Sequence, residues 1–122
     1  MSFNTDLVMS ALPLLFMGAG VTVKITAISV ALGIVIGLFV GIARICHSKA
    51  LRVLAAIYVD FLRGTPLLVQ IFLMYFALPV VTGQRIDPFL AAIASCSINS
   101  GAYVAEIFRG GIQSIDAGQM EA

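Results

Sequence analysis

Apolar positions dominate the first third of the chain, from residue 7 to residue 43, where a single lysine carries the only charge. As one helix this run would measure about 55 Å, which exceeds the hydrocarbon core of a bilayer, about 30 Å thick. Because Gly18 and Gly20 interrupt the run, we expect the helix to break there. The pattern therefore predicts a short interfacial helix over residues 7–17, followed by a membrane span over about residues 21–43.

Two further apolar segments follow, and a proline opens each of them. Thr65 is a candidate N-cap, and Pro66 fits the first position of a helix, where its missing N–H costs nothing. We predict a second span over about residues 66–81. An aspartate–proline pair at 87–88 repeats the pattern and opens a third span over about residues 88–107. Alanine and serine are frequent in that span, which indicates burial among other helices.

The connector between the first two spans, residues 44–65, is basic. It holds one acidic side chain and four basic ones: Asp60 against Arg44, Lys49, Arg52 and Arg63. Cytoplasmic loops of membrane proteins carry such an excess, so we expect the connector to be cytoplasmic. The N-terminus and the loop before residue 88 then lie outside. The narrow charged strip suits a helix on the membrane surface, and a connector helix packed under the bundle fits equally well.

Composition supports a membrane protein. Of the 122 residues, 61% are hydrophobic and 11% are charged, whereas soluble domains carry about 25% charged residues. A globule of this size cannot bury so much apolar surface. We therefore predict an all-α integral membrane protein, with three transmembrane helices preceded by the interfacial helix. The formal net charge of +1 gives no indication of nucleic acid binding.

The sequence contains no recognisable catalytic or metal-binding set. It has no P-loop, zinc-type helix pair, nucleophile elbow or dinucleotide motif. Cys46 and Cys96 are too far apart for a metal-type spacing and do not make a disulfide framework. His47 is best explained as a surface-turn residue. We expect no metal, no cofactor bound by this chain and no enzymatic activity, so any energy would come from another chain.

Two helix faces carry a pattern that composition alone does not explain. In the first span Gly33, Gly37 and Gly41 recur every four residues, which predicts close helix packing, either within the bundle or between subunits. In the third span four polar residues lie within an arc of about 80° on an ideal helix, namely Ser95, Asn99, Tyr103 and Glu106. A row of this kind faces either a water-filled path or neighbouring helices.

Gln70, alone in the second span, is open to the same two interpretations. Together with the four polar residues of the third span, it is a candidate for lining a substrate path, on grounds of polarity and helix phase. Glu106 and Arg109 are three residues apart and could form an ion pair, as could Asp60 and Arg63.

Two segments resemble a known family. They are YVDFLRGTPLLVQIFLMYFALP, residues 58–79, and SINSGAYVAEIFRGGIQSIDAGQMEA, residues 97–122. With the pieces RGTP, AYVAEIFRGGI and GQxEA in that order, the chain resembles the permease subunits of bacterial ABC importers for polar amino acids, of the histidine, glutamine, glutamate, arginine and opine type. The similarity extends from about residue 17 to the end.

The resemblance implies a multi-pass protein of the bacterial cytoplasmic (inner) membrane with about five transmembrane helices. Such a permease pairs with a like or unlike permease subunit, receives substrate from an extracytoplasmic amino acid binding protein and couples to two ATPase subunits, which hold ATP and Mg. The loop over residues 115–122 matches the start of the ATPase-docking motif at four positions: Gly118, Gln119, Glu121 and Ala122.

The remainder of that motif and two further spans do not follow in this sequence. The chain therefore resembles the N-terminal part of a permease, and we expect that it does not transport on its own. The alternative is a small independent three-span membrane protein, such as an oligomeric channel or an assembly factor. A reading frame that continues past residue 122 into two more apolar segments would exclude this alternative.

Overall fold

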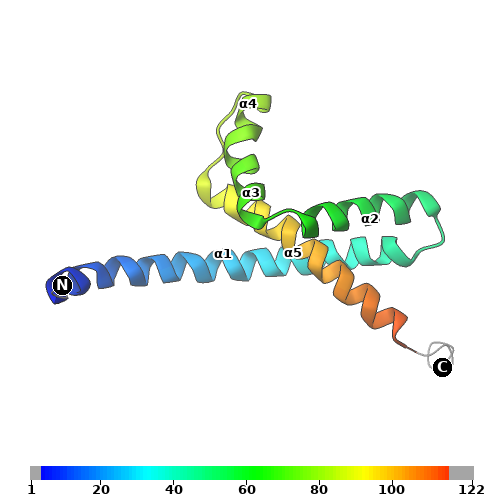
Figure 1. Cartoon of the computed structure of the whole chain (residues 1–122), viewed down its shortest axis with the longest axis horizontal. Helices are drawn as coiled ribbons and strands as arrows, with labels where there is room; N and C mark the ends of the chain where they lie inside the picture. The colour runs from blue at the N-terminus through cyan, green and yellow to red at the C-terminus, as the bar shows by residue number, and fades with distance from the viewer. Residues whose placement is uncertain (1–3, 116–122) are drawn as a thin grey trace.

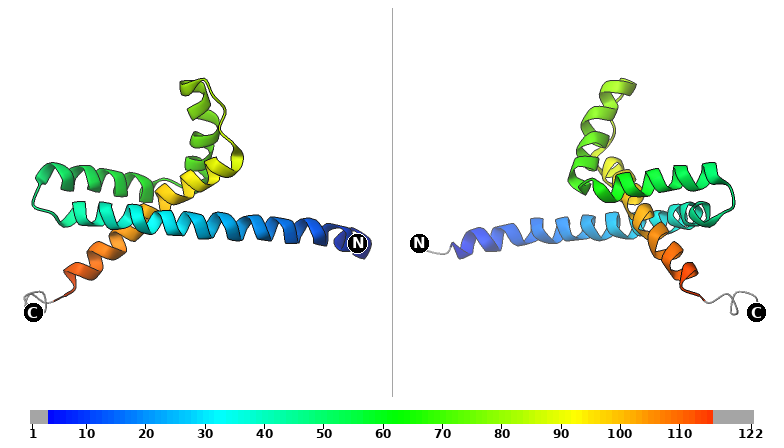
Figure 2. Two further views of the ribbon diagram at one scale, coloured as in Figure 1. Left: turned by 180° about the vertical axis from the view of Figure 1, so that it is seen from behind. Right: turned by 45° about the vertical axis from the view of Figure 1, so that its right-hand side comes forward.

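The computed structural model describes residues 4–115, and every element in that range is helical (Figure 1). The elements are α1 Thr5–Ile45, α2 Lys49–Gly64, α3 Leu67–Phe72, the π-helical turn η1 Leu73–Ala77, α4 Leu78–Thr82 and α5 Pro88–Gln113. The predicted all-α class is thereby confirmed for the described residues. Helix α2 folds back along the C-terminal half of α1, and α5 crosses this pair (Figures 1 and 2).

Helix α1 is one uninterrupted helix of 41 residues. Its N-cap is Asn4, whose side chain accepts a hydrogen bond from the backbone N–H of Leu7 at 3.1 Å. The predicted break at Gly18 and Gly20, and with it a separate interfacial helix over residues 7–17, is wrong. A glycine inside a helix costs only about 1 kcal/mol relative to alanine. In lipid, a break in an apolar run would leave backbone groups unpaired, and each unpaired group costs on the order of several kcal/mol.

Two helices, α1 and α5, are each long and apolar enough to cross a membrane within the described residues. Helix α2 and the segment Leu67–Thr82, which we call the α3–α4 arm, become a third candidate only when they are taken together, and they meet at 105°. At about 1.5 Å per residue the arm measures about 24 Å, shorter than the bilayer core. The structure thus supports two or three spans, and the predicted second span over residues 66–81 corresponds to the arm.

The two prolines occupy different positions. Pro88 is the first residue of α5, as predicted, whereas Pro66 is the extended N-cap of α3, so its predicted place at the first helical position is wrong. Thr65 is the C-cap of α2, and its hydroxyl donates to the carbonyl of Phe61 at 2.7 Å. The predicted N-cap role of Thr65 is therefore wrong, because its hydroxyl is already bonded backwards to α2. The predicted cap of α5 is confirmed, since the Asp87 carboxylate accepts from the backbone N–H of Phe89 at 3.0 Å.

The core of the molecule lies where α5 crosses α1 and α2, and Val59 of α2 is fully buried there. The buried residues of α1 are small: Ser29, Gly33, Gly37 and Gly41. A Cβ atom added to any of the three glycines would come within 2.6 Å of a side-chain atom of α5, in the pairs Gly33–Ser100, Gly37–Val104 and Gly41–Phe108. Both numbers of each pair rise together, so the two helices point in the same direction where they cross, and their backbones lie closer than side chains on both would allow.

Candidate functional site

The polar row of α5 does not lie in one common environment. Ser95 is 2% exposed, and its hydroxyl has no hydrogen-bond partner within residues 4–115. Tyr103 is 44% exposed. The other two members, Asn99 and Glu106, are bonded to side chains from other helices. Side-chain hydrogen bonds and ion pairs therefore join the row to other helices at two places, Asn99 and Glu106. Of the other two members, Ser95 is buried and Tyr103 is exposed.

The first of these places is a contact between α5 and the α3–α4 arm. The Asn99 side-chain amide donates to Gln70 Oε1 at 3.2 Å. The structure thus brings together two residues that sequence reasoning placed on different spans. Gln70 is 8% exposed and borders a largely apolar groove of about 390 Å³ between α2, the arm and α5.

The second place is a cluster of three arginines around Glu106. Arg109, one turn further along α5, approaches the carboxylate with two nitrogens at 2.6 and 3.2 Å, as the three-residue spacing allowed. Arg44 at the end of α1 lies 3.1 Å from Glu106 Oε1. Arg63 at the end of α2 lies 3.6 Å from Oε2. We call these four residues the Glu106 cluster.

The Glu106 cluster joins three helices through one carboxylate. Its acid is the least exposed member, at 15% of the side chain, and Arg63 is the most exposed, at 46%. The guanidinium of Arg63 also lies 5.6 Å from the centre of the Tyr103 ring, within the range of a cation–π contact. Three cations surround one anion in the cluster, so Glu106 is the group that holds the arginines together.

Two contacts between helices were not predicted from the sequence, one made by Arg44 and one made by Tyr58. Arg44 was interpreted as a loop charge that sets orientation, and the hydroxyl of Tyr58 was not considered, although it donates to the carbonyl of Ile98 on α5. Both contacts join residues at least 40 positions apart, so the periodicity of a single helix contains no signal for them. No ion pair joins Asp60 and Arg63 in the described part of the chain, because Arg63 turns toward Glu106.

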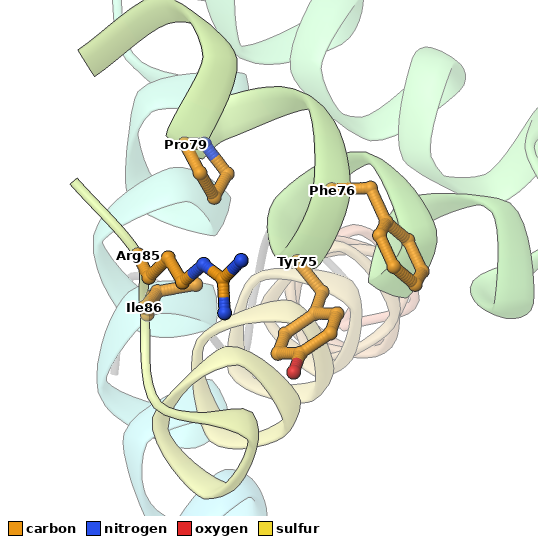
Figure 3. Close-up of a pocket in the computed structure, with 5 residues that line it drawn as sticks. All are labelled: Tyr75, Phe76, Pro79, Arg85 and Ile86. Carbon is orange, nitrogen blue, oxygen red and sulfur yellow. The ribbon is translucent and has the colours of Figure 1, made fainter. Parts of the chain in front are cut away.

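A cavity of about 330 Å³ lies between the π-helical turn, α4 and the loop before α5 (Figure 3). It is lined by Tyr75, Phe76, Pro79, Arg85 and Ile86. The Arg85 side chain extends toward Tyr75 in this view. The cavity forms because Gly83, with a φ of 77°, reverses the chain after α4 and brings the loop back toward η1. An arginine among apolar walls can hold an anionic or carbonyl oxygen.

The remaining predicted residues fall into two groups. Gly33, Gly37 and Gly41 lie against α5, as described above. The four candidate docking residues, Gly118, Gln119, Glu121 and Ala122, lie outside the described residues. Within residues 4–115, no three His, Cys, Asp or Glu side chains lie close enough together to hold a metal ion.

Comparison with known proteins identifies similar chains along the whole length. A glutamine transport system permease protein of Escherichia coli (strain K12) and one of Shigella flexneri are each 44% identical over 123 residues, which cover 100% of this chain and 56% of theirs. A crystal structure of an amino acid ABC transporter with histidines matches with a TM-score of 0.89 and 38% identity, over 99% of this chain and 56% of that one. The chain thus spans about half the length of the relatives it matches.

The family model for the inner membrane component of binding-protein-dependent transport systems matches residues 33–122. That range contains the glycine stripe of α1, the bend between α2 and the arm, and the whole of α5. From the match over most of its length, this chain belongs to the family of binding-protein-dependent transport system inner membrane components.

Proposed function

We propose that this chain forms part of the membrane-spanning subunit of an ATP-driven importer that moves a polar amino acid inward across the bacterial inner membrane. The observation that carries the proposal is the similarity, along the whole chain, to permeases named for glutamine transport. Permeases of this kind are not enzymes themselves. ATP and Mg would be bound by a partner ATPase, and this chain would hold no cofactor.

The partners follow from the same proposal. They are a second permease subunit, like or unlike this one, two ATPase subunits and an extracytoplasmic amino acid binding protein. The exposed apolar side chains of α1, which extend along most of its length, support contact with lipid or with other helices. The docking contact with an ATPase would involve Gly118, Gln119, Glu121 and Ala122.

We place the N-terminus outside and the turn between α1 and α2 in the cytoplasm. The excess of basic residues in the connector, residues 44–65, supports this orientation. Helices α1 and α5 point in the same direction, so both would then cross from outside to inside. Single cysteines introduced by Ser48→Cys and Gln84→Cys, in a chain without its native cysteines, test it. A membrane-impermeant thiol reagent added to intact spheroplasts should label position 84 and not position 48. The reverse labelling would contradict the orientation.

The substrate path would run past Gln70, Ser95, Asn99, Tyr103 and Glu106. The hydrogen bond between Asn99 and Gln70, which brings two of these residues together, supports this path. We expect Asn99→Ala to alter amino acid uptake or selectivity while the protein still assembles. Unchanged uptake and selectivity would instead favour a role of Asn99 in joining the helices.

A chimaera tests the proposed transport function. Residues 1–122 would replace the matching segment of the Escherichia coli glutamine permease, in cells that lack that permease but keep its partners. We expect energy-dependent uptake of labelled glutamine to return. A chimaera that reaches the membrane in normal amounts and does not transport would contradict the proposal. The same chimaera with Glu106→Gln controls for uptake that does not depend on this chain, and we expect it to transport less.

A further inference from the structure

The bend between α2 and the arm, at residues 65–66, leaves a hydrogen-bonding gap in the backbone. Proline has no N–H, so Pro66 cannot donate to the carbonyl of Leu62, four residues earlier, as a helical residue would. A carbonyl without a donor in apolar surroundings is unfavourable, and buried polar groups of this kind are almost always paired. Another group must therefore donate to Leu62.

Gln70 supplies that donor. Its side-chain nitrogen lies 3.0 Å from the carbonyl oxygen of Leu62 and 3.0 Å from that of Thr65. A carboxamide nitrogen carries two N–H groups, so one can serve each carbonyl. The side chain of Gln70 thus takes the place of the N–H that Pro66 lacks, and it does so from the other side of the bend.

The two backbone carbonyls also fix which way the Gln70 amide faces. Because its nitrogen is directed at Leu62 and Thr65, its oxygen must face away from the bend, toward α5. There it accepts from Asn99 at 3.2 Å, and the facing group of Asn99 must then be its nitrogen. One side chain consequently bonds to α2, to the turn and to α5 at the same time.

A second bond holds the other side of the bend to the same place on α5. The hydroxyl of Tyr58, on α2, donates to the backbone carbonyl of Ile98, the residue next to Asn99. Helix α2 and the arm are therefore each hydrogen-bonded to one of two consecutive residues of α5. Any change in the angle between α2 and the arm must stretch at least one of these bonds.

We propose that Gln70 is a positioning residue that fixes the angle between α2 and the α3–α4 arm and couples this angle to α5. In this role the side chain of Gln70 substitutes for a backbone donor at the bend. Its consequence for transport rests on the proposed function: if the helices rearrange during a transport cycle, the bend and α5 would move together.

Inter-helix distances test the coupling directly. Spin labels at Leu54→Cys on α2 and Val81→Cys on α4, both exposed, report on the angle in the full chain with its partner subunits, after Cys46→Ser and Cys96→Ala. Gln70→Glu removes both donors and places a carboxylate against two carbonyls. We expect a roughly twofold wider distance distribution, because the bend loses its hydrogen bonds. Gln84→Glu, the same change in an exposed loop, should leave the distribution unchanged.

Two further variants separate the parts of the proposal. Asn99→Ala keeps the donors at the bend but removes the bond to α5. It should leave the Leu54–Val81 distribution narrow and widen the one between labels on α3 and α5, at Leu68 and Ile107. Pro66→Ala restores the missing N–H, so the helix can continue and the Leu54–Val81 distance should lengthen.

The proposal is overturned if the Leu54–Val81 distribution stays narrow in Gln70→Glu and the Leu68–Ile107 distribution stays narrow in Asn99→Ala. If Gln70→Glu does not reach the membrane, Asn99→Ala and Pro66→Ala still decide it. The distances do not depend on transport, so the two proposals can fail separately. A chimaera that does not transport, combined with a widened Gln70→Glu distribution, would refute the proposed function and leave the coupling standing.

Discussion

Helix α5 is held by two interfaces that work by different physical means. Against α1 it packs on glycines. The two backbones can lie close together only because these positions of α1 carry no side chain. Against α2 and the arm it is held by side-chain hydrogen bonds, from Tyr58 to Ile98 and from Asn99 to Gln70. The first interface should fail when a few carbon atoms are added. The second should fail when a polar atom is exchanged at constant size.

The largest effect is expected at the α1–α5 interface. Gly37→Leu would drive its side chain into Val104, with the backbone nitrogen of Ala105 only 3.0 Å from the first added carbon. Since α5 cannot yield locally, we expect a loss of about 3 kcal/mol of stability, at the upper end for overpacking. The measurement is the thermal unfolding midpoint of the purified protein in detergent.

Gly20→Leu provides the control for this change. Nothing lies within 4 Å of a Cβ atom at that position, so the same substitution should have little effect on the unfolding midpoint. If both variants lose stability equally, the effect comes from leucine itself and not from the close approach of α1 and α5.

The Glu106 cluster should be the next most sensitive feature, because it belongs to both interfaces. Glu106→Gln keeps the shape but removes the charge that holds Arg44, Arg63 and Arg109 together. The arginines are partly exposed, so we expect a loss of about 2 kcal/mol, below the range for a fully buried pair.

High salt sharpens this test, because screening should reduce the difference between Glu106→Gln and the parent protein. Asp6→Asn is the control, since Asp6 is exposed and forms no ion pair within residues 4–115. Equal losses in the two variants would mean that Glu106 acts only through the overall charge of the chain.

A smaller effect is expected for a single hydrogen bond of the second interface. Tyr58→Phe removes the donor to Ile98 without changing the ring, and we expect a loss of about 1 kcal/mol. Tyr75→Phe is the control, because the hydroxyl of Tyr75 has no hydrogen-bond partner in the described part of the chain. Unfolding in detergent measures the stability of both variants. If Tyr58→Phe loses no stability, water replaces the lost hydrogen bond.

The contrast between the two interfaces also explains what could be predicted from the sequence. Asp87 before a proline gives a local signal for the start of α5, and the structure places the cap there. Glycines four residues apart lie on one side of any helix, and α5 lies against that side of α1. Both inferences use information from within one helix.

Contacts between helices could not be predicted in the same way. Arg44 and Glu106 are 62 positions apart, and nothing in the phase of either helix links them. The role of Gln70 is an intermediate case. It stands four residues after Pro66, where a side chain can reach back across the bend, but only the folded chain shows that Leu62 is its acceptor.

The error at Gly18 and Gly20 has a different origin, and it leads to the smallest predicted effect. A break was expected there because the apolar run is longer than a bilayer core and the two glycines interrupt it, yet the helix continues and keeps its backbone bonds paired. If that account is right, Gly20→Ala should raise stability by at most about 1 kcal/mol, through helix propensity alone. Gly33→Ala, on the same helix, should lower it, because its Cβ would lie 2.5 Å from Cβ of Ser100. Unfolding midpoints of the two variants measure the signs. Opposite signs would show that the cost of a side chain on α1 depends on whether α5 faces it, whereas equal signs would remove the distinction between the free and the packed parts of this helix.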